Sequence, residues 1–371
     1  MKFFKFRLKN LIKNALWWSA LCAVLLLSVF YAFPSLSSRG AAEEKNQSER
    51  PVVLSLWHID TFEGGKGSRA SFLKNVALSY CKQNKKIIIM VSSYSAAGAE
   101  AAFESGNYPD MLSFGIGLNA DPAMFSALKI SGLLSAESEK QAGKREAAYA
   151  GATGQNGGEA AAIAWCCGCY ALYSRTDDFS RVGADTTLIS SGGGNLATVA
   201  AALRLGKGND ENVKKSVAAY AAFLNGDAEY LLGTQRDAYR FCSRGAEVRA
   251  CAVSDYNDLY QYIGVTHRSN ANAAQKQAGE ECAAFLKYLL SHEVQSALYK
   301  IGMFSPYFKI YAPIAAESAE TALSAQLESG WFDTGIKRTI GVFLSDAAYA
   351  KADGYARNGN VTELKKILKT L

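Results

Sequence analysis

The stretch Val52-Val-Leu-Ser-Leu-Trp57 and the loop after it, His58-Ile-Asp-Thr-Phe-Glu-Gly-Gly-Lys-Gly67, decide the fold. The first six residues are almost all apolar, which predicts a strand buried on both faces of a parallel sheet. The next ten form a glycine-rich loop, and a helix opens at Ser68. That helix has an apolar stripe at helical spacing, made by Phe72, Leu73, Val76, Ala77 and Tyr80. Strand, loop and helix in this order predict one unit of an α/β fold.

The residues that follow repeat the alternation. A second apolar strand is predicted within Lys86–Ser92, a helix over Ala96–Ser105, and a third strand over Met111–Phe114. Strands alternating with helices predict right-handed crossovers and a parallel sheet. Further along, the pattern predicts strands over 160–165, 170–174 and 230–233, helices over 196–205, 211–224 and 274–290, and a glycine loop over 190–195. With 371 residues, the chain is long enough for two such domains.

The N-terminus is typical of export. Residues 1–14 form a basic flank, Ala15–Phe33 is a run of nineteen residues without charge, and 34–50 is a polar linker. About 20 apolar residues span a bilayer as a helix, and the basic flank should stay in the cytoplasm. We therefore expect a signal or anchor helix over 15–33, with the body of the protein outside. Whether the helix is cleaved stays open.

The net charge of +6 belongs to this segment. Six cations precede the first acidic residue, Glu43, and removing them leaves 34 basic and 34 acidic residues. A neutral body argues against a nucleic-acid-binding protein.

Seven cysteines lie outside the apolar run, an odd number for an exported chain. Cys242 and Cys251 flank a plausible hairpin, so a disulfide between them stays open. The cluster Cys166-Cys-Gly-Cys169 has no second cluster to complete a zinc site, so we expect no metal and no cofactor. Cys22 lies inside the apolar run without the usual lipid-acceptor pattern, which disfavours lipidation.

Catalysis finds little support. The chain has three histidines and no nucleophile elbow, phosphate-binding loop or zinc-protease motif. Asp60 and Glu63 form a carboxylate pair on one loop, which alone is weak support for glycoside hydrolysis. We therefore expect a binding protein rather than an enzyme.

Four stretches together resemble bacterial extracellular solute-binding proteins of family 1, the sugar-binding type that serves ABC transporters. They are Trp57-His-Ile-Asp-Thr-Phe-Glu-Gly-Gly-Lys-Gly-Ser-Arg69, Gly106-Asn-Tyr-Pro-Asp-Met-Leu-Ser-Phe-Gly115, the region 223–237 and the region 284–306. The resemblance runs from about Val52 to the C-terminus, and its specificity lies in the order and spacing of the stretches.

The resemblance implies a two-lobed, periplasmic-binding-protein-like fold of type II, an α/β fold with the ligand between the lobes. It assigns 51–159 and 263–305 to lobe I, and 160–262 and 306–371 to lobe II. The chain should cross between lobes near 161–170, 255–264 and 304–308. Hinge closure over the ligand is the expected motion.

A sugar needs aromatic platforms and planar polar groups. The aromatic candidates are Trp57, Trp165, Trp331 and Tyr239, with Tyr256 behind them; each tryptophan could equally be part of the core. The polar candidates are Asp60, Glu63, Asp110, Gln235, Arg236 and Asn257. For Asp110 a turn or capping role is an equal alternative, and Arg236 could form a surface pair with Asp237.

The sequence therefore predicts the solute-binding component of an ABC-type importer, with permease subunits as partners and the membrane reached through the N-terminal helix. The ligand is a small solute, a mono- or oligosaccharide. Two alternatives stay open: a membrane-tethered sensory domain and, less favoured, a secreted carbohydrate-active enzyme.

Overall fold

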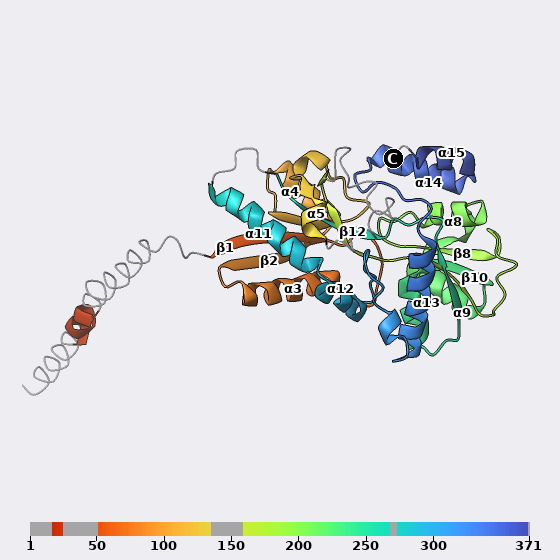
Figure 1. Cartoon of the computed structure of the whole chain (residues 1–371), viewed down its shortest axis with the longest axis horizontal. Coiled ribbons are helices and arrows are strands. Elements are labelled where there is room, and N and C mark those ends of the chain that lie inside the picture. Colours follow the sequence, from red (N-terminus) through yellow and green to blue (C-terminus); the bar gives the residue numbers. More distant parts are fainter. Residues whose placement is uncertain (1–16, 25–50, 135–158, 268–272, 370–371) are drawn as a thin grey trace, which may run out of the picture. The chain divides into compact units, whose positions relative to one another are not determined.

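The computed structural model describes residues 17–24, 51–134, 159–267 and 273–369 (Figure 1). The chain divides into two units, Met1–Val52 and Val53–Leu371, which we treat separately. In the first unit the described residues 17–24 are helical. The rest of the predicted segments 1–14, 15–33 and 34–50 lies outside the described residues. Among the residues that are described, no helix has both the length and the apolar character needed to cross a bilayer.

The second unit is built on two five-stranded sheets. The first has the order β2-β1-β3-β12-β6, with bounds Ile87–Tyr94, Val52–Ile59, Met111–Phe114, Tyr260–Val265 and Ile163–Cys167. β1 and β3 are parallel, whereas β12 is antiparallel to both of its neighbours. We call the part of the chain built on this sheet lobe I.

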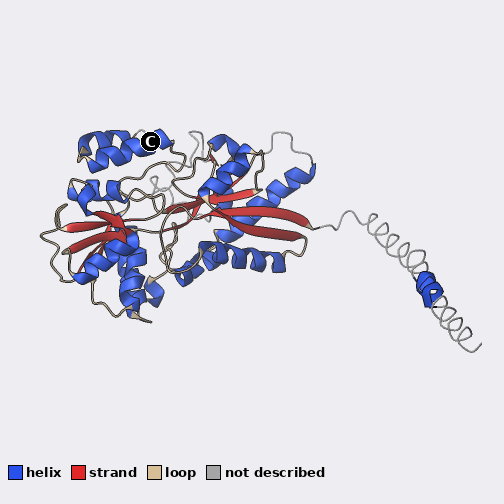
Figure 2. Cartoon of the chain, turned by 180° about the vertical axis from the view of Figure 1, so that it is seen from behind, coloured by secondary structure: helices blue, strands red, loops and turns tan. Residues whose placement is uncertain are grey.

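Helices cover both faces of the first sheet, because its strands are apolar on both sides. α3 (Arg69–Gln83) places Phe72 against Trp165 of β6, with ring centroids 5.9 Å apart. α4 (Ala96–Glu104) lies on the other face, where Phe103 stacks on Trp57 of β1. α11 (Ala273–Leu289) packs beside α3, and Figure 2 shows helices on either side of the strands of this sheet.

The second sheet has the order β11-β7-β10-β8-β9, with bounds Arg249–Val253, Tyr170–Ser174, Tyr230–Thr234, Thr187–Ser191 and Val213–Lys215. β8, β9 and β10 run parallel, and β7 runs against β10 and β11. We call the part built on this sheet lobe II. Its helices are α8 (Ala197–Leu205), α9 (Ser216–Asn225), α10 (Gln235–Ser243), α13 (Ala319–Thr334), α14 (Asp346–Arg357) and α15 (Val361–Ile367).

The chain crosses between the sheets three times. It passes between Cys167 and Tyr170, between Val253 and Tyr260, and again after Phe304, whose backbone exchanges two hydrogen bonds of 2.9 Å with Cys167. The remaining short elements are β4 (Leu128–Lys129), β5 (Glu159–Ala160), α5 (Ile130–Leu133), α12 (His292–Ser296), and the 3₁₀ turns η3 (Pro122–Met124), η4 (Asp210–Asn212), η5 (Ala297–Ile301) and η6 (Ala312–Ile314).

Sheet membership differs from the predicted lobe boundaries at two strands. The prediction gave 160–262 to lobe II, but β6 and all of β12 pair within the first sheet. The apolar run Ile163–Cys167 is compatible with either sheet, and only its pairing with β12 decides between them.

Candidate functional site

A cavity of about 320 Å³ lies where the carboxyl ends of strands from both sheets meet. Lobe I contributes the loop after β1 and the start of α3, and lobe II contributes the loop after β8 and the start of α10. Its lining residues are Asp60, Phe62, Glu63, Gly64, Gly67, Arg69, Gly193 and Arg236. Open α/β sheets bind ligands beyond the carboxyl ends of their strands, so this is the candidate site.

Asp60 and Arg69 form the polar pair on the lobe I side. Arg69 is the first residue of α3; its side chain is 4% exposed, and its Nε donates to Asp60 Oδ1 over 2.7 Å. His58 Nε2 lies 2.9 Å from the same oxygen. Both contacts fall on Oδ1, and the Asp60 side chain is 57% exposed. Its second oxygen, Oδ2, is therefore available to a ligand.

The partners of Ser113 fix the tautomer of His58. Ser113 Oγ accepts from Trp165 Nε1 at 2.9 Å and from Gln261 Nε2 at 3.3 Å, and it lies 3.0 Å from His58 Nδ1. With two donors already aimed at its oxygen, Ser113 gives its own proton to Nδ1. His58 is then protonated at Nε2 and donates to Asp60.

The pKa values of this pair agree with that arrangement. Burial lowers the pKa of His58, so the ring is neutral near pH 7. Burial alone would raise the pKa of Asp60, but the hydrogen bond from His58 and the charge of Arg69 outweigh it and hold that pKa well below its usual range. Asp60 is therefore an ionised acceptor at physiological pH.

Glu63 reaches from lobe I into lobe II. Its Oε2 accepts from Ser216 Oγ at 2.5 Å and lies 3.4 Å from Arg240 Nη2 and 3.7 Å from Arg236 Nη1. Ser216 begins α9, and both arginines lie on α10. The carboxylate of one lobe thus sits among the cationic groups and helix N-termini of the other.

Backbone contacts also join the two lobes beside the cavity. Phe62 and Gly193 form an antiparallel bridge, and the amide of Gly194 donates to the carbonyl of Thr61. Gly193 has a φ of +72°, and a Cβ there would lie 2.7 Å from the Cα of Phe62. The glycine loop after β8 therefore allows an approach that any side chain would block.

Three of the ten predicted site residues, Asp60, Glu63 and Arg236, line this cavity. The four aromatic candidates are buried in the two lobes instead. Trp57 stacks on Tyr94 with centroids 4.2 Å apart, Trp165 packs on Phe72, and Trp331 is a core residue of α13. The Tyr239 hydroxyl lies 2.8 Å from that of Tyr311. Each ring is at most 6% exposed, so it serves the core.

Gln235, the first residue of α10, and Asn257, in the second crossing, both bond to the first crossing between the lobes. Gln235 Oε1 accepts from the backbone amide of Cys169 at 3.1 Å, and the backbone amide of Gln235 donates to the Cys169 carbonyl at 3.0 Å. Asn257 Nδ2 donates to the carbonyl of Gly168 at 3.0 Å. Both side chains therefore fix the first crossing segment.

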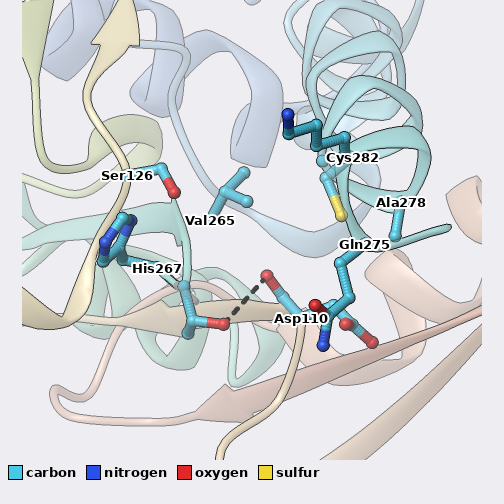
Figure 3. A pocket seen from close by; sticks show the side chains of 10 residues that line it. Asp110, Ser126, Val265, His267, Gln275, Ala278 and Cys282 are labelled. Carbon is cyan, nitrogen blue, oxygen red and sulfur yellow. Dashed lines mark hydrogen bonds between the residues drawn. The ribbon is translucent and has the colours of Figure 1, made fainter. Parts of the chain in front are cut away.

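Asp110 lies at the opposite end of the first sheet. It precedes β3, and its Oδ2 accepts from both the amide and the hydroxyl of Ser55 at 2.8 Å. It lines a second cavity of about 210 Å³ against Val265 and the α11 residues Gln275, Ala278 and Cys282 (Figure 3). Its carboxylate joins β1 to β3, far along both strands from the interlobe cavity.

Arg69 and Phe62 are the cavity-lining side chains that sequence reasoning missed, together with the glycines Gly64, Gly67 and Gly193. The Arg69 guanidinium lies 4.1 Å from the centre of the Phe62 ring. A signal existed, because Arg69 follows a glycine-rich loop at the start of a helix, but sequence does not show that this arginine is buried.

Neither metal binding nor a disulfide is seen in the described part of the chain. No group of three His, Cys, Asp or Glu side chains there is placed to hold a metal ion. Cys242 and Cys251 are not disulfide-bonded.

Comparison with known proteins shows the fold. No protein-family model matches the chain, and no curated protein matches it in sequence. Among solved structures, the match to the cyclic α-maltosyl-1,6-maltose-binding protein of Arthrobacter globiformis covers 86% of this chain and 96% of that one, with 12% identity and a TM-score of 0.55. A maltodextrin-binding protein of L. casei BL23 matches with 13% identity, coverage of 86% and 98%, and a TM-score of 0.53.

An extracellular solute-binding protein of family 1 from Alicyclobacillus acidocaldarius matches with 12% identity, coverage of 86% and 98%, and a TM-score of 0.51. At these identities the likeness concerns the fold alone. The chain therefore has the α/β, periplasmic-binding-protein-like fold that the sequence predicts.

Proposed function

We propose that this protein is the extracellular solute-binding component of an ABC-type importer, which captures a mono- or oligosaccharide between its lobes. One observation carries the proposal: the cavity at the carboxyl ends of both sheets is lined by Asp60 and Arg69 from one lobe and Gly193 and Arg236 from the other. A ligand held there would touch both lobes, so it would favour the closed arrangement over the open one.

The chemistry of the cavity suits hydroxyl groups. A sugar hydroxyl both donates and accepts, and Asp60 offers an ionised acceptor beside the donors of Arg69. A volume of about 320 Å³ is at the small end of the usual range for ligand sites, about 300–1,000 Å³. Asp60, Arg69 and Arg236 are the ligand contacts we propose, with Gln235 and Asn257 as hinge residues.

Two further lines support the wider role. The similar structures include proteins named for binding maltodextrin and cyclic maltosyl-maltose. The basic flank and the apolar run 15–33 support export, with the helix as an anchor or signal and permease subunits as partners. We infer no catalytic activity, because Glu63 is paired with lobe II cations.

The test is binding of a solute panel to the purified protein, by thermal shift and calorimetry, with sugars, amino acids and polyamines. We expect a sugar to raise Tm. Asp60→Asn should weaken its binding at least about tenfold, because a charged acceptor is lost.

The control is Asp177→Asn, since Asp177 also pairs with an arginine, Arg249, but both side chains are exposed. The Tm of each unliganded variant separates lost binding from lost folding. A panel in which amino acids or polyamines raise Tm and no sugar does would refute the sugar assignment.

A further inference from the structure

Lobe II carries a group of donors around a single point, which we call the cradle: Ser216, Arg236 and Arg240. All three approach Glu63 Oε2, at 2.5, 3.7 and 3.4 Å respectively. Arg240 Nη1 also donates to Ser216 Oγ at 2.8 Å, which fixes the serine with its hydroxyl proton directed at the carboxylate. The geometry of the cradle is that of a site for one carboxylate.

The start of α9 adds to this field. Its N-cap residue, Lys215, makes no side-chain capping bond, so the first backbone amides of this ten-residue helix receive no hydrogen bond from the N-cap side chain. A helix N-terminus of this kind favours an anion. Gly192 closes the cradle, because a Cβ there would lie 2.9 Å from Glu63 Cδ.

Glu63 belongs to lobe I, and so it leaves the cradle whenever the lobes separate to admit a ligand. Among the residues that the structure describes, the two arginines then remain paired with one carboxylate, Asp237, which Arg240 Nη1 contacts at 2.8 Å. Within that part of the chain, one positive charge is left without an acidic partner. On the lobe I side the charge of Asp60 is already balanced by Arg69.

A second observation in the same cavity points the same way. Arg69 is buried, it lines the cavity, and its Nη1 has no hydrogen-bond partner among the described residues. A buried guanidinium N–H without a partner is costly, and a ligand oxygen would satisfy it. Donors from both lobes are thus available to an anionic, hydroxylated ligand.

We infer that the cradle binds the carboxylate of an acidic sugar, and that Glu63 is an internal stand-in that occupies the cradle when the sugar is absent. This inference rests on the proposed function and names its substrate class. The hydroxyls of the sugar would meet Asp60 and Arg69, while its carboxylate takes the place of the Glu63 carboxylate.

The first experiment compares glucuronate and galacturonate with glucose and galactose by calorimetry on the full chain. We expect each acid to bind at least about tenfold more tightly than its neutral counterpart, since charge-assisted hydrogen bonds are added. Arg236→Gln and Arg240→Gln should each reduce this preference to about threefold or less. Arg181→Gln is the matched control, because Arg181 is 70% exposed and pairs with Glu229 before β10.

The second experiment uses Glu63→Gln, which removes the competing carboxylate. Acidic sugars should bind this variant at least about threefold more tightly than they bind the unmodified protein. The affinity for neutral sugars should change by less than about twofold. An equal effect on both classes would mean that Glu63 only holds the lobes together, and it would overturn the inference.

Neutral sugars binding as tightly as the acids would also overturn the inference, although the proposed function would stand. If neither the acidic nor the neutral sugars bind, both the proposed function and this inference are overturned.

Discussion

Ser113 shows how a single buried hydroxyl can decide the geometry of a site that it does not touch. It accepts from Trp165 and Gln261, donates to His58, and through His58 positions Asp60. Trp165 belongs to this network through its indole N–H, although its ring is in the core and not in the cavity. Trp165 positions the site through a chain of hydrogen bonds.

Ser113→Ala should lower the free energy of unfolding by about 2 kcal/mol, because it leaves the indole N–H of Trp165 buried without an acceptor. Urea denaturation followed by tryptophan fluorescence measures the change. Ser105→Ala is the control, since the Ser105 hydroxyl bonds to the carbonyl of Ala101 at an exposed position. A loss for Ser113→Ala as small as that of the control would contradict the proposed network.

At this scale the sequence predicts polar site residues better than aromatic ones. Asp60 and Glu63 lie in a glycine-rich loop that follows an apolar strand, which places them beyond the carboxyl end of that strand. A tryptophan carries no such signal, because stacking on Phe72 and stacking on a sugar need the same residue type. Asp110 was misleading for a related reason: it lies beside a strand, but at the strand's amino end.

At the scale of elements, α13 is tied to the turn before it by one buried acid. Glu328 accepts from the amides of Ile310 and Tyr311 at 2.8 Å each. Burial raises the pKa of Glu328 to about 7, although these amides favour the charged form. The folded protein therefore keeps a proton on Glu328 at pH values where the unfolded chain, with an ordinary pKa of 4.5, has lost it.

The contribution of Glu328 to the free energy of unfolding must then fall as pH rises from about 4.5 to about 7, because in that window the folded state binds more protons than the unfolded state. His58 acts in the opposite sense, since burial lowers its pKa. The prediction is therefore the difference between the protein and Glu328→Gln: urea unfolding should give a pH slope that is less negative in the variant.

Glu317→Gln, an exposed carboxylate beside the same turn, should leave the slope unchanged. Identical slopes in the protein and Glu328→Gln would show that Glu328 does not titrate in this window.

Most elements were predictable because apolar periodicity reports local structure. The predicted strands over Met111–Phe114 and 230–233 are confirmed. The predicted helix over 211–224 begins only at Ser216, since Val213–Lys215 pairs with β8 at the sheet edge. There, as for β6, pairing with a strand distant in the sequence overrides the local apolar pattern. The periodicity of the sequence carries no information about such pairing.

For the whole molecule, closure depends on how nearly the lobes can approach each other beside the cavity. Glu63 forms ion pairs with arginines of lobe II. Gly193 allows the two backbones to approach, because a side chain at this position of the Phe62–Gly193 bridge would clash. The sequence predicts a glycine loop over 190–195, but not that this loop forms part of the contact between lobes. That contact joins residues more than a hundred positions apart.

Gly193→Ala should keep each lobe folded yet prevent full closure. The new Cβ would lie 2.7 Å from Phe62 Cα and 2.8 Å from Thr61 O, so the lobes must separate to relieve the clash. Small-angle scattering should give a larger radius of gyration than for the unmodified protein, and ligand affinity should fall at least about tenfold.

Gly206→Ala is the matched control for the backbone cost. Gly206 has a φ of +86°, but a Cβ there meets nothing within 4 Å. Both variants should lose about 1–2 kcal/mol of unfolding free energy from the left-handed conformation. Only Gly193→Ala should change the radius of gyration and the affinity, since only there does the methyl group stand between the lobes. An equal radius of gyration for the two variants would mean that closure does not depend on the contact between Phe62 and Gly193.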